Sequence, residues 1–363
     1  MKRPAYASVV AGLPATTPFV GPEALERRIG RTIELRLGAN ESPFGPSPLA
    51  IEAMQKQAQS AMNYGDPEGY VLRTEIARLI GVGIENVSLG AGIDELLGLC
   101  CRLFVDPGSR IVTTLGSYPT FDYVASSSGA VLVRVPYHNE SIDLGALADS
   151  ARRSGARIAY LANPDNPSGS WHPNDSLAEL RRGLPGNCVL LLDEAYCDFA
   201  PETPPIDPTD LQVLRLRTFS KVYGMAGMRI GYIVGHADHI RALDKIRLHF
   251  GVNIVAQAGA LAALRDPQWV ADVVTKTTMG RAELGEFFRG LALRPLTSHT
   301  NFLTIAVGSR AYAEAILDAL LRHGVFIRKP GHPPLDGCIR VTIGRPEQRA
   351  RFEDIFRQVL TEI

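Results

Sequence analysis

The sequence predicts an α/β fold in which a large, sheet-containing domain is followed by a smaller α/β domain. Its 363 residues, 45% of them hydrophobic, are enough for one or two well-filled cores. Short apolar runs alternate along the chain with longer segments of helical pattern, which is typical of α/β proteins. Polar turns rich in glycine and proline directly follow several of the apolar runs. Sites of open α/β sheets gather at strand ends, so these turns are the candidates for a functional site.

The first thirty residues read as an irregular arm with one short helix near Pro22–Ile29. Pro22 suits the first turn of a helix, and acidic residues come after it where they are favoured. A short strand at 35–37 leads into a loop at 38–48 that three prolines and two glycines fix. The next elements are a helix at about 48–62, a helix at 72–80, a strand at 87–89 and a helix ending at Phe104.

The rest of the chain alternates regularly between the two kinds of element. Strands are predicted at 110–114, 130–136, 158–161, 189–192, 211–216 and 230–234, and helices at 144–154, 175–182 and 236–248. Helices fill 254–290, one of them long and linking two domains. Strands at 293–295, 302–306, 325–328 and 339–344 and helices at 310–323 and 346–360 complete the pattern. We expect an N-terminal arm (1–35) that joins a small C-terminal domain (256–363), and a large domain (36–255) between them.

Composition excludes several classes of function. The 38 basic and 38 acidic residues cancel and no long basic run occurs, so neither nucleic acid nor a membrane surface is an expected partner. No apolar stretch is long enough to span a bilayer. Met1–Pro4 only slightly resembles the start of a signal peptide, and Gly12 and Pro14 interrupt the apolar segment after it. Five cysteines without a C-x-x-C pattern indicate reduced thiols, so we expect a cytoplasmic protein.

The stretch around Lys221 is a polar turn between two apolar segments. Gly224 and Gly227 allow the backbone to turn tightly or a ligand to approach closely. A lysine that is desolvated, or that lies near another cation, can lose its proton and attack a carbonyl group. Arg229, eight residues on, could be that cation or could hold a phosphate. The alternative is an ordinary surface lysine in a loop.

The segment Gly90–Glu95 is a glycine-rich turn from a strand into a helix. Such a turn offers unpaired N–H groups and the positive end of a helix to a phosphate. It could also begin the G-x-G-x-x-G fingerprint of dinucleotide-binding proteins, but Glu95 stands where the third glycine belongs. A nicotinamide-dependent oxidoreductase is therefore a remote alternative.

The sequence Ser220-Lys221 with Arg229 resembles the Ser-Lys-x₇-Arg signature of class I/II aminotransferases, which depend on pyridoxal phosphate (PLP). The resemblance covers nearly the whole chain and is strongest to histidinol-phosphate aminotransferases. It implies the aspartate aminotransferase-like fold (fold type I), with a mostly parallel seven-stranded sheet. In that family the lysine holds PLP as a Schiff base, and the serine and arginine hold its phosphate.

Other turns match the family residue by residue. Gly92, Ile93 and Asp94 stand where the family has the G-S-D of its phosphate cup. Ile93 replaces the serine, so the backbone donor remains but the hydroxyl contact is lost. Tyr118 matches the aromatic ring that stacks on the pyridine; without the resemblance it would pass for a core tyrosine.

Three further positions match groups that contact the ring of the cofactor. Asn166, in Asn-Pro-Asp-Asn-Pro-Ser-Gly, and Tyr196 match the residues that bond the phenolate oxygen. Asp193 comes after four apolar residues, at the expected end of a central strand. A carboxylate there can keep the pyridine nitrogen protonated, although an Asp at such a turn could simply cap a helix.

The remaining matches concern the substrate and a second subunit. Tyr64 matches a tyrosine that reaches across a dimer interface to the PLP phosphate of the neighbour, so the resemblance implies a homodimer with shared active sites. Asn40 lies near the substrate in such enzymes, although it could also cap a turn. Arg340, in a β-branched strand, matches the arginine that grips the α-carboxylate. Arg328 matches a second arginine, for a distal anion, or is a solvated strand end.

The resemblance implies transamination between an amino donor and a keto acid such as 2-oxoglutarate, with Lys221 as the proton-transferring base. Histidinol phosphate is the leading amino donor. Phe19 stands where the family has a substrate-contacting tyrosine and cannot donate to a phosphate. An aromatic or other amino-acid aminotransferase is therefore a rival, as is a PLP-dependent decarboxylase of a phosphorylated amino acid. A PLP-binding regulator without turnover is a further alternative.

Overall fold

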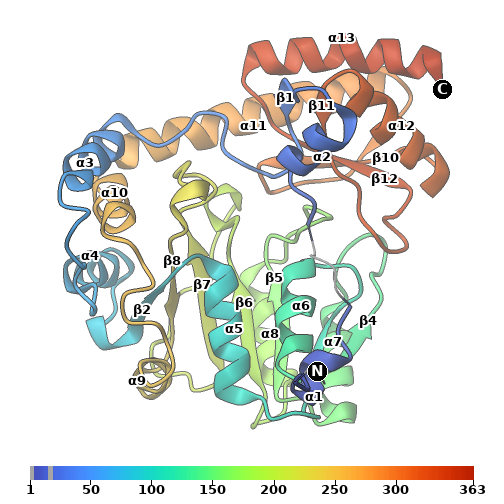
Figure 1. The fold of residues 1–363 in the computed structure, drawn as a ribbon. Coiled ribbons are helices and arrows are strands. Elements are labelled where there is room, and N and C mark those ends of the chain that lie inside the picture. The colour runs from blue at the N-terminus through green and yellow to red at the C-terminus, as the bar shows by residue number, and fades with distance from the viewer. Residues whose placement is uncertain (1–3, 15–18) are drawn as a thin grey trace.

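The computed structural model describes residues 4–14 and 19–363. Residues 1–3, which slightly resemble the start of a signal peptide, and Pro18, which precedes Phe19, lie outside the described residues. The chain forms a large α/β layer structure with a smaller lobe above the upper ends of its strands, and a long helix joins the two (Figure 1). No helix in the described part of the chain combines the length and the hydropathy needed to cross a membrane.

A seven-stranded sheet is the centre of the large part. Its order is β2 (Val87–Gly90), β8 (Gly231–Val234), β7 (Val213–Thr218), β6 (Val189–Asp193), β5 (Ile158–Ala162), β3 (Arg110–Thr114) and β4 (Val131–Val135). Only β8 runs antiparallel to its neighbours; the other pairs are parallel. The mostly parallel seven-stranded sheet is thereby confirmed.

Side chains on the two faces of the sheet enter different cores. Ile158 and Tyr160 of β5 point into one core, and Ala159 and Leu161 point into the other. This alternation arises from the two-residue repeat of a strand, and burial on both faces explains why these strands read as continuous apolar runs. The first core takes helices α5 (Ile93–Phe104), α6 (Pro119–Ser127) and α9 (Ala237–Leu243), and the second takes α7 (Leu144–Ser154) and α8 (Asn174–Gly183).

Three helices cover the β2–β8 edge of the sheet. They are α3 (Pro48–Ala58), α4 (Tyr70–Ile80) and α10 (Ile254–Leu264), and they share a hydrophobic cluster with residues of β2 and β8. From there α11 (Pro267–Gly290) runs across the top of the molecule to the smaller lobe (Figure 1). The expected long connecting helix is therefore present.

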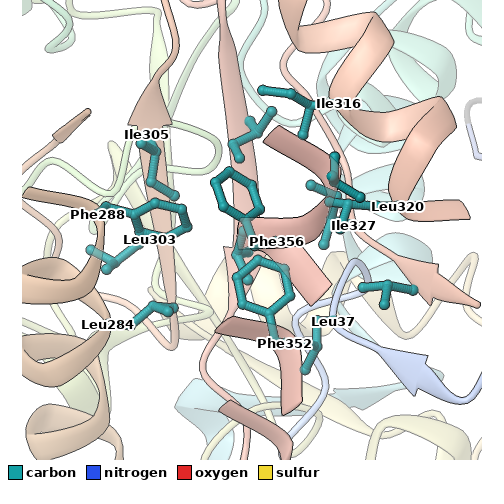
Figure 2. Packing of buried hydrophobic residues seen from close by; sticks show 14 of the residues in the cluster. Leu37, Leu284, Phe288, Leu303, Ile305, Ile316, Leu320, Ile327, Phe352 and Phe356 are labelled. Carbon is teal, nitrogen blue, oxygen red and sulfur yellow. The ribbon is translucent and has the colours of Figure 1, made fainter. Parts of the chain in front are cut away.

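The smaller lobe holds a three-stranded antiparallel sheet, with β10 (Phe302–Ala306) between β9 (Arg294–Pro295) and β12 (Cys338–Thr342). Helices α12 (Arg310–Arg322) and α13 (Pro346–Glu362) pack on it, and α2 (Pro22–Ile29) lies in the same lobe (Figure 1). The N-terminal segment joins through β1 (Leu35–Arg36), which pairs in parallel with β11 (Val325–Phe326). The core, with Phe352 and Phe356 near its centre, is shown in Figure 2. The expected domain limits stay a prediction.

Several helix limits differ from expectation. Helix α3 ends at Ala58 rather than near residue 62, and α9 ends at Leu243 rather than at 248, because turns replace the last expected helical turn at both sites. The sequence pattern does not predict helix α6, since its serine-rich end hides the apolar repeat. The arm also contains a four-residue helix, α1 (Ser8–Ala11), that packs near α6. In the part of the chain that the structure describes, short 3₁₀ turns occur at Ile84–Asn86, Cys197–Phe199 and Ala226–Met228.

Candidate active site

A cavity of about 340 Å³ lies where the carboxyl ends of the parallel strands face the smaller lobe. This is the position that an open α/β sheet favours for a ligand. Almost all of the site residues expected from the sequence line it: Phe19, Asn40, Ile93, Asp94, Tyr118, Asn166, Asp193, Tyr196, Ser220, Lys221, Arg229, Arg328 and Arg340. Gly92 adjoins the lining through Ile93, whereas Tyr64 lies elsewhere.

Lys221 sits in the turn after β7 and points into this cavity rather than into bulk water. Its Nζ donates to the backbone oxygen of Asn40 at 3.2 Å and lies 5.5 Å from the centre of the Tyr196 ring. The turn depends on Gly224, whose φ is +68°. A Cβ there would lie 2.1 Å from the carbonyl oxygen of Gly45, so only glycine lets the loop at 38–48 pass so close.

An anion-binding cup forms beside Lys221. The guanidinium of Arg229 lies 3.5 Å from Oγ of Ser220 and 3.3 Å from Oδ2 of Asp94. Gly92 precedes α5 with a φ of +83°, and a Cβ there would lie 2.3 Å from Nη2 of Arg229. Cation, hydroxyl and helix N-terminus thus converge on one place, which suits a phosphate group. Ile93 offers its backbone there, but no hydroxyl.

Asp193 ends strand β6 and is buried at the floor of the cavity. Its Oδ1 accepts from the backbone N–H of Ala195 at 3.0 Å, a contact within the turn that follows β6. Its Oδ2 accepts from the hydroxyl of Tyr160 at 2.8 Å. Burial raises the pKa of Asp193 to about 6, because desolvation disfavours the charged carboxylate. A cationic ligand group next to it would restore the charged form.

Tyr196 and Asn166 face the cavity from two different strand ends. The hydroxyl of Tyr196 accepts from Nδ2 of Asn40 at 2.9 Å. The side-chain oxygen of Asn166 accepts from Nη1 of Arg340. Both polar groups are held by protein contacts in places from which they can also bond a ligand.

Two arginines of the smaller lobe complete the cavity. Arg340 is 8% exposed, donates from Nη2 to the oxygen of Gly38 at 3.0 Å and keeps a buried Nε without a partner in the described chain. Burial lowers the pKa of Arg340 to about 10. Arg328 forms a β-bridge with Arg340, and its guanidinium lies 4.8 Å from the Phe19 ring and 5.2 Å from the Phe326 ring. Neither has an ion pair within residues 4–14 and 19–363. Arg340 is buried whereas Arg328 is half-buried. A buried cation needs a counter-charge, which an anionic ligand can supply.

Tyr118 contributes a half-buried aromatic ring to the cavity wall. Its hydroxyl donates to Oδ1 of Asp94 at 2.8 Å, and burial raises the pKa of Tyr118 well above its usual range. The hydroxyl is therefore anchored at the anion-binding cup, which fixes the ring at the edge of the cavity.

Tyr64 is the expected site residue that the cavity does not include. It is 85% exposed, and its ring lies 4.8 Å from that of Phe250. Among the described residues of one chain, Tyr64 is not part of the cavity lining.

Sequence reasoning missed two buried residues at the site: Tyr160, which lines the cavity, and Asp165, which lies outside the lining. Tyr160 lies within an apolar strand run, which hides its hydroxyl among core side chains. Asp165 is completely buried and accepts from the hydroxyls of Ser117, Tyr137 and Ser168, which ties the Asn166 turn to the segment before Tyr118. The sequence did offer a signal for each residue. Tyr160 is a polar side chain inside an apolar run, and Asp165 is a polar side chain in a segment bounded by prolines.

The layers, the strand order and the site at the strand ends define an enzyme of the aspartate aminotransferase fold. An aspartate aminotransferase from Thermus thermophilus has this fold with a TM-score of 0.81 at 21% identity, over 98% of this chain and 100% of that one. Residues 32–353 match the family model "Aminotransferase class I and II", and the chain belongs to that family. It is therefore an aminotransferase.

Two relatives are more similar in sequence. Histidinol-phosphate aminotransferase 1 of Nitrosococcus oceani is 33% identical over 98% of both chains. The crystal structure of histidinol-phosphate aminotransferase from Sinorhizobium meliloti in complex with pyridoxal-5'-phosphate has a TM-score of 0.93 and 42% identity, and covers 98% of each chain.

These findings argue against the alternative of a nicotinamide-dependent oxidoreductase. Strand β2, which precedes the Gly90–Gly92 turn, is an edge strand antiparallel to β8. The dinucleotide fingerprint instead needs a central parallel strand before its glycine turn. Membership in an aminotransferase family also displaces the alternative of a regulator without turnover.

Proposed function

We propose that this enzyme transfers the amino group of histidinol phosphate to a keto acid such as 2-oxoglutarate. The observation that carries the proposal is one cavity lined by the lysine, a buried carboxylate and two arginines that have no carboxylate partner among the described residues. The lysine and the carboxylate suit the cofactor, and the arginines suit anionic substrates. The relatives from Nitrosococcus oceani and Sinorhizobium meliloti, the second solved with PLP, support the choice of amino donor and cofactor.

The cofactor is PLP, and the residues present fit it. Ser220, Arg229 and the N-terminus of α5 would hold the phosphate, and Gly92 leaves room that a Cβ would fill. Asp193 would hold the ring nitrogen, and Asn166 and Tyr196 the phenolate oxygen. When bound, PLP supplies an aldehyde that combines with amines and a protonated ring that takes up electrons.

Lys221 has two tasks in this scheme. Its Nζ would hold the cofactor aldehyde between turnovers, until the amine of the substrate takes its place. The freed Nζ would then accept the proton from Cα of the substrate and donate it, within the same half-reaction, to the carbon of the cofactor that carried the aldehyde. The contact with the Asn40 oxygen keeps the amine inside the cavity for this transfer.

Arg340 and Arg328 bind the acidic groups of the substrates. A guanidinium binds a carboxylate or a phosphate through two parallel hydrogen bonds, so the same arginines suit both substrates of the cycle. A substrate that displaces water from the cavity makes these contacts stronger than they would be in bulk water. The keto acid and the phosphorylated amine can therefore use one site in turn.

Phe19 favours a second candidate, an aromatic amino-acid aminotransferase. Its ring lies 6.1 Å from that of Tyr118 and against Arg328, so it offers an apolar surface and no hydroxyl to the substrate. A decarboxylase of the same fold acting on a phosphorylated amino acid is the further alternative. One assay separates all three: histidinol phosphate, aromatic amino acids and phosphorylated amino acids are each supplied with 2-oxoglutarate. Glutamate formation and CO₂ release are measured.

We propose a cytoplasmic homodimer in which Tyr64 reaches the cofactor phosphate of the other copy. Exposed apolar side chains near Tyr64 support an interface at this surface: Met62, Leu248 and Phe250. The five free, buried cysteines suit a reducing compartment. We keep the division into arm (1–35), large domain (36–255) and small domain (256–363) as part of the proposal.

A further inference from the structure

The carboxylate of Asp193 is held by two donors, one on each oxygen. Ala195 donates its backbone N–H to Oδ1 at 3.0 Å, and Tyr160 donates its hydroxyl to Oδ2 at 2.8 Å. None of the described basic side chains forms an ion pair with Asp193. These two hydrogen bonds are therefore the groups that favour its charged form and fix the plane of the carboxylate.

The hydroxyl of Tyr160 has little freedom to move. The residue is 1% exposed, and its ring stacks on that of Phe121 with centres 4.0 Å apart and planes 13° apart. Strand β5 holds the backbone between β3 and β6. Tyr160 also lines the active-site cavity together with Asp193, to which its hydroxyl is bonded.

A carboxylate that keeps a ring nitrogen protonated must stay charged and correctly oriented. Removing the water around it favours the neutral acid, and a donated hydrogen bond opposes that effect. The backbone N–H of Ala195 orients one oxygen only. A second donor is needed to stop the carboxylate from rotating about its Cβ–Cγ bond.

We propose that Tyr160 is a positioning residue, whose hydroxyl holds Asp193 charged and aimed at the ring nitrogen of the cofactor. Tyr160 acts through Asp193 and not through contact with the substrate. The inference rests on the proposed function, because it needs Asp193 to face the ring nitrogen.

The test compares two ligands in the full-length enzyme: PLP, and the PLP analogue in which C–H replaces the ring nitrogen. Equilibrium dialysis gives a Kd for each. In Tyr160→Phe the ring and its stacking on Phe121 remain, but the donor is lost. We expect the Kd for PLP to rise about tenfold, as a lost hydrogen bond to a charged group predicts, and the Kd for the analogue to stay within about twofold.

Tyr137→Phe is the matched control. Tyr137 is also buried and also donates to a buried carboxylate at 2.8 Å, that of Asp165, which is outside the cavity lining. It should change the two Kd values by the same factor. If Tyr160→Phe also raises both values equally, its role is structural and the inference is wrong.

Asp193→Asn separates this inference from the proposed function. If the wild type prefers PLP to the analogue and Asp193→Asn loses that preference, Asp193 does face the ring nitrogen. A preference that then survives in Tyr160→Phe overturns only the role of Tyr160. A wild type without any preference overturns the role of Asp193 and the inference together.

Discussion

The side-chain amide of Asn40 donates to the hydroxyl of Tyr196 at 2.9 Å, which joins the loop after β1 to the strand end that carries Asp193. The same Asn40 side chain accepts from Oγ1 of Thr342, on β12, at 3.3 Å. One buried residue therefore links the large sheet with the strand that carries Arg340. Its backbone lies in the left-handed region, with a φ of +55°.

We predict that Asn40→Ala lowers both stability and turnover. It leaves two buried hydroxyls without this partner and keeps an alanine at a positive φ, which together cost about 2–4 kcal/mol of unfolding free energy. Asn139→Ala is the control, because Asn139 has a φ of +47° but is exposed. It should cost only about 1 kcal/mol. Urea unfolding measures both, and equal losses would contradict a special role for the Asn40 side chain.

Lys221→Ala should abolish transamination while the protein stays folded. The loss in turnover should be at least about 10²–10⁴-fold, since both a covalent anchor and a general base disappear. Borohydride reduction and then mass spectrometry of the peptides locate the reduced cofactor. Lys276→Ala, which changes a lysine on the outer face of α11, should leave activity and adduct unchanged. An adduct in Lys221→Ala would show that another amine holds the cofactor.

The buried carboxyl of Asp193 should make the unfolding free energy of the cofactor-free enzyme depend on pH in a specific way. Its pKa is about 6 when folded, against about 3.9 for an unfolded aspartate. The folded state thus binds more protons between these values, so stability falls as the pH rises from about 4 to 6. Asp193→Asn lacks this titration, so its stability relative to the wild type should rise by up to about 3 kcal/mol across that window. Urea unfolding at several pH values measures the difference, and a flat difference contradicts the raised pKa.

Much of the site could be predicted because its residues stand in local turns after apolar runs. Lys221 and Asp193 each stand at the end of a strand, so sequence position alone places them at one edge of a parallel sheet. Tyr160 could not be found this way, because its partner is 33 residues away on the neighbouring strand and its apolar neighbours suggest core packing. The sequence pattern predicts a longer α3 for a related reason. The helical pattern continues past Ala58, but the chain forms turns between Ala58 and Gly65, and these end the helix.

Arg340 should determine how well anionic substrates bind. Arg340→Gln removes the buried guanidinium but leaves a polar group for Asn166 and the Gly38 oxygen. We expect kcat/KM for 2-oxoglutarate to fall about 10²-fold, in line with loss of a bidentate, charge-assisted contact. Arg340→Lys should not restore it, because an ammonium group cannot bind in the same bidentate way. Arg294→Gln, at an exposed pair with Glu140, should leave steady-state kinetics unchanged. Full rescue by lysine would mean that only net charge matters.

Tyr64 allows a test of shared active sites by mixing subunits. A Tyr64→Ala chain keeps its own Lys221, and a Lys221→Ala chain keeps its own Tyr64, so each homodimer should be weak or inactive. In a hybrid dimer one site receives Lys221 from one chain and Tyr64 from the other, while the second site lacks both. If half of the dimers are hybrids, the mixture should recover about a quarter of wild-type turnover after unfolding and refolding together. The 85% exposure of Tyr64 within one chain leads us to expect that it is supplied across the interface. No recovery, with hybrid dimers confirmed by mass, would contradict this.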